Sequence, residues 1–544
     1  MTEAADRIFV DGEVHTLADP DDGGDTVHEA VAVRDGEIVR TGRTRDVKRL
    51  AGVATDVVDL DGRVLLPGFV DAHTHLTTVG RYLVHADLSA ADSPRGAVDL
   101  LADRAVEVEE AEEAERADPD GNSSGGDGNA AGDGWILGYG YDESTWTESR
   151  YLTREDLDRV STERPVAAFR EDMHVAAVNG VALDRFADEL ADAPAETVPT
   201  DADGEPTGVL LEAAIDPIYR AVEPGPDETR AVVEAALDHC AARGITGFHD
   251  MVRDSQAPRV YRDLDAAGEL TARVRINYWT DHLDAAREVG LATNAGSDRV
   301  ETGAIKSYTD GSFGGRTARL SEPYADDDEA TGQWVVDPAE LREAVAKATE
   351  AGFQFTAHAI GDEAVAAVLD AYEDASETDP GDARHRIEHV ELADDAAIER
   401  LAESGVVASV QPNFLKWAGE DGLYESRLGP DRTAETNRYR DMLDAGVRLA
   451  FGSDGMPMDP LFGVHHAVNA PADAQRLTVT EALRAYPTGA AYAGFDEDRL
   501  GTIEPGKRAD FVALDASPWE NADEIDEIDV AATVVDGEVV FDDR

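Results

Sequence analysis

The chain has 544 residues and carries 115 acidic against 48 basic side chains, which gives a formal net charge of −67. This length suffices for a large core and more than one domain, and the charge argues against nucleic acid or an anionic membrane surface as a partner. The acidic residues are spread along the chain, whereas a protein that binds basic partners would gather them in blocks. The spread is typical of a cytoplasmic protein from a salt-accumulating halophile. No apolar run is long enough to span a bilayer, so we expect no membrane partner.

Short β-rich runs stand at both ends of the chain. Three of them turn on an Asp-Gly pair, the strongest short signal for a hairpin, because Gly supplies the positive φ of a type I′ turn. The runs are IFVDGEVHTL at 8–17, AVAVRDGEIVRTG at 30–42 and ATVVDGEVVFDD at 532–543. Two hairpins would open the chain and a third would close it. We therefore predict one small β domain built from residues 1–66 and 497–544.

Between these ends, at 67–496, apolar β-like runs alternate with Ala-rich helical stretches, which is the pattern of a parallel α/β fold. Eight runs match a (β/α)8 TIM barrel, in which active-site groups lie at the C-terminal ends of the strands. The runs are LLPGFVDAHTH (65–75), GITGFHDM (244–251), RVRINYW (273–279), GAIKSYTD (303–310), FQFTAHAI (353–360), RHRIEHV (384–390), VVASVQP (406–412) and VRLAFGSD (447–454).

Two segments do not fit the eightfold repeat. A ninth candidate strand, PVAAFREDMHVAAVN at 165–179, falls between the first and second runs. We assign it to an inserted subdomain at about 130–225, a candidate cover for the site. The stretch at about 114–134 is rich in Gly, Asp, Asn and Ser and has no apolar periodicity, which predicts a flexible acidic surface loop.

Histidines stand towards the ends of several barrel runs. His73 and His75 are two residues apart on a β-like run, so their side chains face the same side. His358 and His389 end two other runs, and Asp454 ends the last. Any one of these histidines alone is as readily explained by a core side chain bonded to the backbone. As a group at strand ends of one barrel, they indicate a site for zinc or a similar divalent metal.

Lys306 lies inside the apolar run GAIKSYTD, in a chain that almost lacks lysine. A buried amine is costly unless it is paired or chemically changed. One interpretation is an ordinary lysine that reaches solvent or pairs with a neighbouring acid such as Asp310. Because of the histidines we favour a second interpretation, in which a lysine of lowered pKa reacts with carbon dioxide and forms an anionic carbamate between two cations.

These motifs together resemble the amidohydrolase superfamily of metal-dependent hydrolases. The resemblance rests on PGFVDAHTHL, the His358 and His389 segments, GSD and the closing GTIEPGKRADFVALD. The segments WILGYGYDESTW, PVAAFREDMHVAAVNGVAL, PTGVLLEAA and IKSYTDGSFGGRTARLSEPY look like amidohydrolase family 3, the branch of the N-substituted formamide deformylases. The resemblance covers nearly the whole chain. It implies a distorted TIM barrel with a composite β-sandwich formed by both chain ends.

The resemblance also implies a role for each candidate side chain. The implied ligands of two divalent metal ions, expected to be zinc, are His73 and His75 at the more buried ion, His358 and His389 at the other, Lys306 as the bridging carbamate, and Asp454. Asp454 would also be the catalytic acid/base. Two departures from the family pattern, Met173 in REDMH and the segment GMPM after Asp454, fall near the expected substrate. The substrate class can therefore not be copied from a relative.

We predict hydrolysis of an amide or related non-peptide C–N bond of a small molecule by a hydroxide held between the two metal ions. Asp454 would accept the proton of this hydroxide and deliver it to the leaving nitrogen. His249 and His174 are candidates to orient the substrate carbonyl, with a supporting or structural role as the alternative. Arg316 is a candidate to bind a substrate carboxylate, with a surface ion pair as the alternative.

Two other functions stay open. A mononuclear deaminase of the same superfamily would use His73, His75, His358 and Asp454 around one metal, and it would not need Lys306. A non-catalytic barrel scaffold would be expected to have lost at least one ligand, and all six positions are occupied here. The resemblance also allows a homodimer, which the residues alone do not test.

Overall fold

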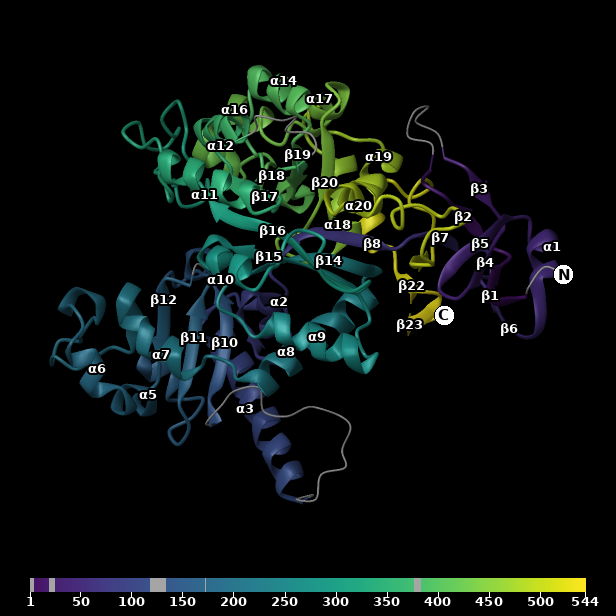
Figure 1. Ribbon diagram of the computed structural model, residues 1–544. Coiled ribbons are helices and arrows are strands. Elements are labelled where there is room, and N and C mark those ends of the chain that lie inside the picture. Colours follow the sequence, from purple (N-terminus) through teal and green to yellow (C-terminus); the bar gives the residue numbers. More distant parts are fainter. Residues whose placement is uncertain (1–3, 19–24, 118–133, 172, 376–382) are drawn as a thin grey trace. The chain divides into compact units, whose positions relative to one another are not determined.

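Eight strands form one parallel sheet in the computed structural model, which describes residues 4–18, 25–117, 134–171, 173–375 and 383–544 (Figure 1). The order is β20-β19-β18-β17-β16-β15-β14-β8, and each neighbouring pair is parallel. The strands are β8 (Phe69–Thr74), β14 (Ile245–Val252), β15 (Arg273–Trp279), β16 (Val300–Tyr308), β17 (Phe355–Ala359), β18 (Arg386–His389), β19 (Val407–Val410) and β20 (Arg448–Phe451). They fall on the eight predicted barrel runs, so this nearly closed α/β barrel confirms the predicted fold class.

The two outer strands of the sheet, β8 and β20, meet at their C-terminal ends. The backbone amides of Ser453 and Asp454 donate to the carbonyl oxygen of His73, at 3.2 and 2.8 Å. The buried Asp71 carboxylate accepts from the backbone amides of His73 and Ser453 at 3.0 and 3.1 Å and from the Ser453 hydroxyl at 2.5 Å. A Cβ at Gly452 would lie 2.4 Å from the His73 nitrogen, so the close approach requires glycine. These contacts close the barrel beside His73.

Helices alternate with the barrel strands along the chain, as βα repeats require. They are α8 (Pro226–Ala242), α9 (Ala257–Ala267), α10 (Leu283–Glu288), α11 (Pro338–Glu350), α12 (Asp362–Ala375), α14 (Asp395–Ser404), α15 (Leu423–Leu428), α16 (Pro430–Ala434), α17 (Tyr439–Asp444), α18 (Pro460–Val468), α19 (Val479–Arg484) and α20 (Ala490–Ala493). Helix α9 is an example of how the sequence sets a helix and its end. Val260, Tyr261 and Leu264 are buried on one face, and Gly268 ends the helix with a φ of 73°. The Tyr261 hydroxyl donates to Asp250 on β14 at 2.7 Å and holds the helix on its strand.

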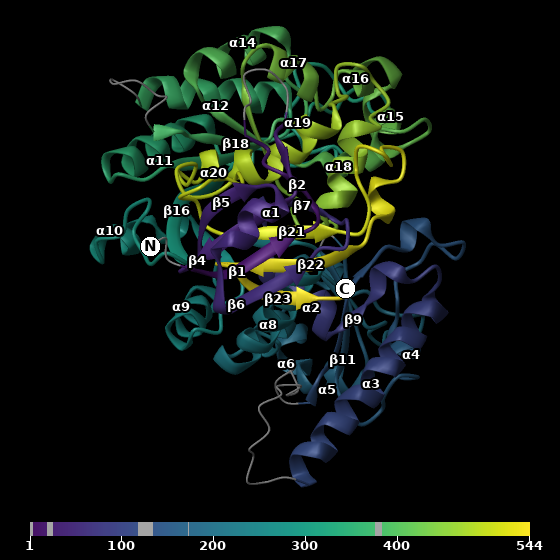
Figure 2. The same ribbon diagram turned by 90° about the vertical axis from the view of Figure 1, so that its right-hand side faces the viewer.

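Both ends of the chain build two further sheets, and Figure 2 shows the N-terminal strands in purple beside the C-terminal strands in yellow. One sheet has the order β5-β4-β1-β6 and the other β23-β22-β21-β7-β2-β3. The strands are β1 (Ala5–Val10), β2 (Glu13–His15), β3 (Val27–His28), β4 (Ala30–Arg34), β5 (Glu37–Gly42), β6 (Ala51–Asp59), β7 (Val64–Pro67), β21 (Phe511–Leu514), β22 (Val530–Val535) and β23 (Glu538–Asp542). One apolar core holds side chains of both sheets, including Phe9 and Phe511, whose ring centroids lie 5.6 Å apart.

One of the three predicted hairpins is wrong. β4 and β5 turn at Asp35-Gly36, and β22 and β23 turn at Asp536-Gly537, as predicted. β1 and β2 do not pair with each other, because β1 pairs with β4 and β6 while β2 pairs with β3 and β7. Asp11 has a φ of 57°, and a Cβ at Gly12 would lie 2.4 Å from the Leu60 side chain. This Asp-Gly pair therefore carries the chain from one sheet to the other.

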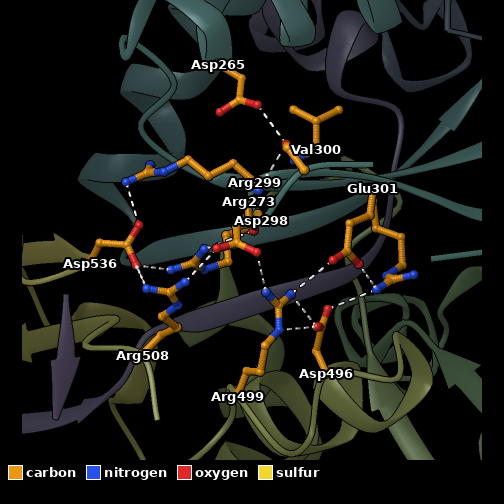
Figure 3. Close-up of polar contacts among 12 residues, drawn as sticks. Asp265, Arg273, Asp298, Arg299, Val300, Glu301, Asp496, Arg499, Arg508 and Asp536 are labelled. Atoms are coloured by element: carbon orange, nitrogen blue, oxygen red, sulfur yellow. Dashed lines mark hydrogen bonds and ion pairs between the residues drawn. The ribbon is translucent and has the colours of Figure 1, made fainter. Parts of the chain in front are cut away.

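A network of ion pairs links the start of β15 and β16 to the C-terminal part of the chain (Figure 3). Arg273, at the first position of β15, binds Asp510 at 2.7 Å and also contacts Asp536. Arg499 continues the network, with its guanidinium 3.1 Å from Glu301 and 2.6 Å from Asp496. The side chains of Arg273 and Asp510 are only 8% and 7% exposed, so each charge depends on the other for its burial.

A second compact unit spans Leu76–Ala236 and contains its own five-stranded sheet, ordered β13-β12-β11-β10-β9. The strands are β9 (Ala86–Asp87), β10 (Ile136–Tyr141), β11 (Val166–Arg170), β12 (Val175–Val178) and β13 (Val209–Leu211), and the helices are α2 (Leu76–Val84), α3 (Pro94–Ala117), α4 (Arg154–Leu157), α5 (Gly180–Arg185), α6 (Ala187–Ala191) and α7 (Asp216–Ala221). The ninth candidate strand of the sequence is the antiparallel pair β11 and β12 of this sheet. It lies outside the barrel sheet.

The predicted loop at about 114–134 begins inside helix α3, which runs to Ala117, and 118–133 lie outside the described residues. The predicted domain boundaries stay predictions; they are 1–66 together with 497–544 for the β domain, 67–496 for the barrel and about 130–225 for the inserted subdomain.

No helix in the described part of the chain combines the length and the apolar character that crossing a membrane requires.

Candidate metal centre

Three predicted ligands converge at the C-terminal ends of β8 and β20. One ligand atom each from His73, His75 and Asp454 lies within 4.8 Å of the other two. The Nε2 atoms of both histidines lie 3.4 Å from the same oxygen, Oδ1 of Asp454. His73 is almost fully buried, while the side chains of His75 and Asp454 are 31% and 19% exposed. The group therefore faces a partly open edge of the barrel.

The backbone places two of the predicted ligands in unusual conformations. Asp454 has a φ of 57°, His389 of 75° and Val390 of 50°. A positive φ is uncommon for residues other than glycine and costs about 1–3 kcal/mol, and such residues cluster at functional sites. His389 directly follows Glu388 on β18, so a regular strand would point the two side chains to opposite faces. The positive φ values at His389 and Val390 redirect the chain at this point.

Glu388, on β18, orients the His73 ring through a hydrogen bond. The Nδ1 atom of His73 donates to Glu388 Oε2 at 2.6 Å, which leaves the lone pair of Nε2 facing Asp454. Glu388 is fully buried and also accepts from Arg386 Nε at 3.0 Å and from the Thr356 hydroxyl. Burial would raise the pKa of Glu388, but Arg386 and His73 hold it well below its usual range. An ionised carboxylate therefore fixes the tautomer of His73.

His358 and His389 lie next to this group, on β17 and β18. The ring of His389 is 5.1 Å from that of His73 and 4.5 Å from that of His358, measured between centroids. The Nε2 atom of His358 lies 3.0 Å from the carbonyl oxygen of Gly311, so donation there leaves Nδ1 free to bind a cation. The Nδ1 atom of His389 is buried without a hydrogen-bond partner in the described part of the chain. Burial lowers the pKa of His358 to about 3 and of His389 well below its usual value, so both rings are neutral.

Asp454 is ionised in this setting. Burial would raise its pKa, but the neighbouring imidazoles, His73 first and then His75, hold the pKa far below its usual range. Its backbone amide is held by the His73 carbonyl oxygen, which places the carboxylate over both histidines. Asp454 is therefore positioned as an anionic ligand and as a proton acceptor.

Lys306 is buried on β16, and its environment departs from that of an ordinary lysine. Within the described residues it makes no hydrogen bond or ion pair, and its ammonium lies 5.9 Å from the ring centroid of Trp279. Asp310 is not its partner, because that carboxylate accepts backbone N–H bonds from Arg319, Ile360 and Gly361. The interpretation as a Lys306–Asp310 pair is therefore wrong.

Burial lowers the pKa of Lys306 to about 8, although Glu388 and Asp454 raise it. A neutral amine fraction is consequently present near neutral pH.

The side chains present fit a divalent metal centre. Imidazole nitrogens and an ionised carboxylate such as Asp454 are ligands that zinc and similar cations prefer. The Nδ1 atom of His389 is a buried polar group without a hydrogen-bond partner among the described residues, which proteins rarely leave unsatisfied. A bound cation would satisfy this nitrogen.

The structure places His249 inside the barrel. Its Nδ1 atom accepts a hydrogen bond from Arg386 at 2.7 Å, and Arg386 in turn binds Glu388. A Cβ at Gly494 would lie 3.2 Å from the His249 Nε2 atom, so both sides of the ring are occupied by protein. His249 is therefore connected to His73 through Arg386 and Glu388. This position fits the supporting role that was given as the alternative to carbonyl binding.

The other two predicted substrate-binding residues, Arg316 and His174, contact acidic side chains of the protein. The Arg316 guanidinium binds Asp326 through Nε at 3.0 Å and Nη2 at 2.6 Å, which is the ion pair given as its alternative. His174 lies in the compact unit Leu76–Ala236, is 68% exposed and contacts Glu212 at 3.0 Å.

Sequence reasoning did not single out Arg386, Glu388 or Asp71. A signal for the first two was present, because Arg386 and Glu388 alternate on a run predicted to be buried and so share one face. Two opposite charges on one buried face are expected to pair. Asp71 stands two residues before His73 and shares its face in the same way, but nothing in the sequence indicates its partner, Ser453, 382 residues further along.

The comparisons with known proteins are decisive for the family. Residues 56–541 match the model described as the amidohydrolase family. The chain belongs to the amidohydrolase family. It is 32% identical to the putative amidohydrolase YtcJ of Bacillus subtilis (strain 168), over 98% of this chain and 99% of that protein. It is 27% identical to the N-substituted formamide deformylase of Arthrobacter pascens, over 99% of this chain and 98% of that protein.

A solved structure supports the same assignment. An uncharacterized metal-dependent hydrolase from Pyrococcus furiosus superposes with a TM-score of 0.76 at 27% identity, over 94% of this chain and 99% of that one. The predicted resemblance to amidohydrolases is therefore confirmed. This amidohydrolase is a metal-dependent hydrolase of the class that acts on carbon–nitrogen bonds other than peptide bonds.

Proposed function

We propose that this amidohydrolase cleaves an amide or related non-peptide C–N bond of a small molecule at a centre of two divalent metal ions, with zinc as the expected metal. His73, His75, His358, His389 and Asp454 would hold the ions, together with a carbamate on Lys306. The observation that carries the proposal is the buried Lys306, which makes no hydrogen bond or ion pair among the described residues and lies on a strand beside the histidine group. A small-molecule substrate is also part of the proposal.

The carbamate follows from ordinary amine chemistry. The neutral Nζ of Lys306 adds to the carbon of carbon dioxide, which forms one N–C bond and releases one proton. Burial favours this reaction, because the lowered pKa increases the neutral fraction of the amine at pH 7. The product is an anion, and its two oxygens would be ligands for cations held by the neighbouring imidazoles.

When bound, divalent cations supply a water molecule of lowered pKa and polarise a carbonyl group. The chain's own residues then decide where protons go. Asp454 is ionised and accepts a proton from the attacking water on its carboxylate oxygen, then delivers that proton to the leaving nitrogen. Glu388 holds His73 in one tautomer throughout, and Arg386 and Thr356 keep Glu388 in place.

One observation favours a second candidate, a mononuclear deaminase. Among the described residues, His73, His75 and Asp454 are the only group of three or more His, Cys, Asp or Glu side chains whose ligand atoms all lie within 4.8 Å of one another. Three such ligands suffice for one catalytic zinc with an open position. This candidate leaves the burial of Lys306 without a chemical reason.

The experiment that tests the proposed function is a hydrolysis screen of the zinc-loaded protein in high potassium chloride. The panel contains N-substituted formamides, N-acyl amines, cyclic amides and aminated heteroaromatic rings. Release of a carboxylate and an amine from at least one amide would support the proposal. Release of ammonia from the heteroaromatic rings alone would favour the deaminase and contradict it. Asp454→Asn is the matched control, and we expect it to be inactive.

A further inference from the structure

Tyr308 is a polar side chain at the metal centre that is neither a proposed metal ligand nor the proposed acid/base. It ends strand β16 two residues after Lys306, so both side chains lie on the same face of the strand. Its ring centroid is 5.1 Å from that of His358 and 4.6 Å from that of Trp279. Tyr308 is partly exposed, in contrast to the buried residues 302–307 directly before it. The ring thus stands at the open edge of the barrel beside the proposed ligands.

The hydroxyl of Tyr308 has no protein partner in the part of the chain that the structure describes. Five buried tyrosines donate their hydroxyls to a protein acceptor, whereas the buried Tyr486 hydroxyl, like that of Tyr308, has no such acceptor among the described residues. The five tyrosines are Tyr261, Tyr324, Tyr372, Tyr424 and Tyr439. Trp279 packs against one side of the Tyr308 ring and His358 against another, so the ring is held although its hydroxyl is not. A positioned donor without an acceptor is what a substrate oxygen requires.

The position of Tyr308 in the barrel matches that of the reacting groups. Tyr308 ends β16, and Asp454 follows shortly after β20. Both residues therefore stand at C-terminal ends of barrel strands, where active-site groups of such barrels lie.

We infer that the Tyr308 hydroxyl donates a hydrogen bond to the carbonyl oxygen of the substrate and to the negative charge that develops on that oxygen. The inference rests on the proposed function, since it assigns a donor to the same hydrolysis. As water adds to the carbonyl carbon, one C–O bond forms and the electron pair of the C=O π bond moves to the oxygen. The proton of Tyr308 stays on Tyr308. When the C–N bond breaks, that electron pair returns and the nitrogen leaves with the proton from Asp454.

The test compares Tyr308→Phe with Tyr278→Phe. Tyr278 lies on the neighbouring strand β15, and its hydroxyl accepts from Arg262 at 2.9 Å, so this control loses the same atom away from the metal centre. On an amide that the wild type hydrolyses, we expect Tyr308→Phe to lower kcat about 10²-fold with little change in KM. We expect the control to stay within threefold of wild type, and metal content to be equal in all three proteins.

A second readout does not depend on turnover. Acetohydroxamate carries an amide-like carbonyl group and chelates zinc through its two oxygens, and isothermal titration of the zinc-loaded proteins gives its Kd. We expect Tyr308→Phe to bind it about tenfold more weakly than wild type and the control. If no amide is hydrolysed but this difference is found, the proposed function fails and the role of Tyr308 as a donor stands. If the wild type hydrolyses an amide and Tyr308→Phe matches the control in kcat and in Kd, the inference is overturned alone. Failure of the wild type to bind acetohydroxamate would overturn both.

Discussion

At the scale of single residues, Glu388 decides how His73 meets a metal ion. The carboxylate is fully buried and ionised, and it accepts hydrogen bonds from His73, Arg386 and Thr356. An imidazole that donates through one nitrogen to a carboxylate binds metal more tightly through the other. Glu391, three residues further along, is also buried, but its pKa is raised and not lowered. Burial raises its pKa to about 8, and it accepts from the Tyr424 hydroxyl.

We predict that Glu388→Gln lowers zinc affinity about 10- to 100-fold, because the amide cannot hold His73 in the required tautomer. Competition with a zinc chelator measures this change. Glu391→Gln is the matched control, since a protonated carboxyl at neutral pH is nearly isosteric with the amide, and its zinc affinity should stay within twofold. Equal zinc affinity for Glu388→Gln and wild type would show that His73 does not need this partner.

A second residue-scale prediction concerns His85, in the compact unit Leu76–Ala236. Its Nδ1 atom is buried without a partner in the described residues, and burial, helped by Arg104 and Arg81, lowers its pKa from 6.5 to about 3. The unfolded chain therefore binds a proton that the folded chain rejects, and stability is lost as pH falls below about 6.5.

Substitution of His85 removes this dependence. Between pH 7 and pH 5, the free energy of unfolding of His85→Phe should rise relative to wild type by about 2 kcal/mol. Urea denaturation at both pH values measures the difference. A gap between the two proteins that does not change with pH would mean that His85 is not kept neutral by the fold.

At the scale of elements, the strand ends explain what could be predicted from the sequence. His358, His389 and Asp454 each stood at the end of a β-like run, and parallel strands bring such ends to one edge. The rest needed coordinates, because it depends on backbone conformation and distant pairing. The positive φ of His389 has no sequence signal, and neither has the Asp71–Ser453 contact that joins β8 to β20. The Asp11-Gly12 pair looked like a hairpin, since a local signal does not tell which sheet each flanking strand joins.

The network in Figure 3 leads to a prediction at this scale. Arg273→Met should destabilise the barrel by about 3–5 kcal/mol, because it leaves the buried Asp510 carboxylate without its cation. Arg259→Met is the control: Arg259 is 68% exposed in its pair with Asp263, and its loss should cost under about 1 kcal/mol. Thermal unfolding in the same buffer compares the two. Equal losses would mean that burial of the network contributes nothing to stability.

At the scale of the whole molecule, the net charge of −67 dominates. We propose that this surface belongs to a protein adapted to high salt, because self-repulsion opposes folding and salt screens it. The screening length falls from about 10 Å at 0.1 M to about 3 Å at 1 M ionic strength. We expect the Tm to rise by several degrees between 0.1 and 2 M potassium chloride. A similar rise in 1 M sucrose, which does not screen charge, would show that electrostatic screening is not the cause.

The central claim is a centre of two metal ions bridged through Lys306. Its most direct test is metal content per chain by elemental mass spectrometry, after purification in high potassium chloride with zinc and bicarbonate. We expect about two metal ions in wild type and clearly fewer in Lys306→Ala. Lys347→Ala is the control, since Lys347 lies on α11 in an exposed pair with Asp284, and it should retain about two. One metal ion per chain in wild type and in Lys306→Ala alike would contradict the bridged centre and favour the mononuclear deaminase.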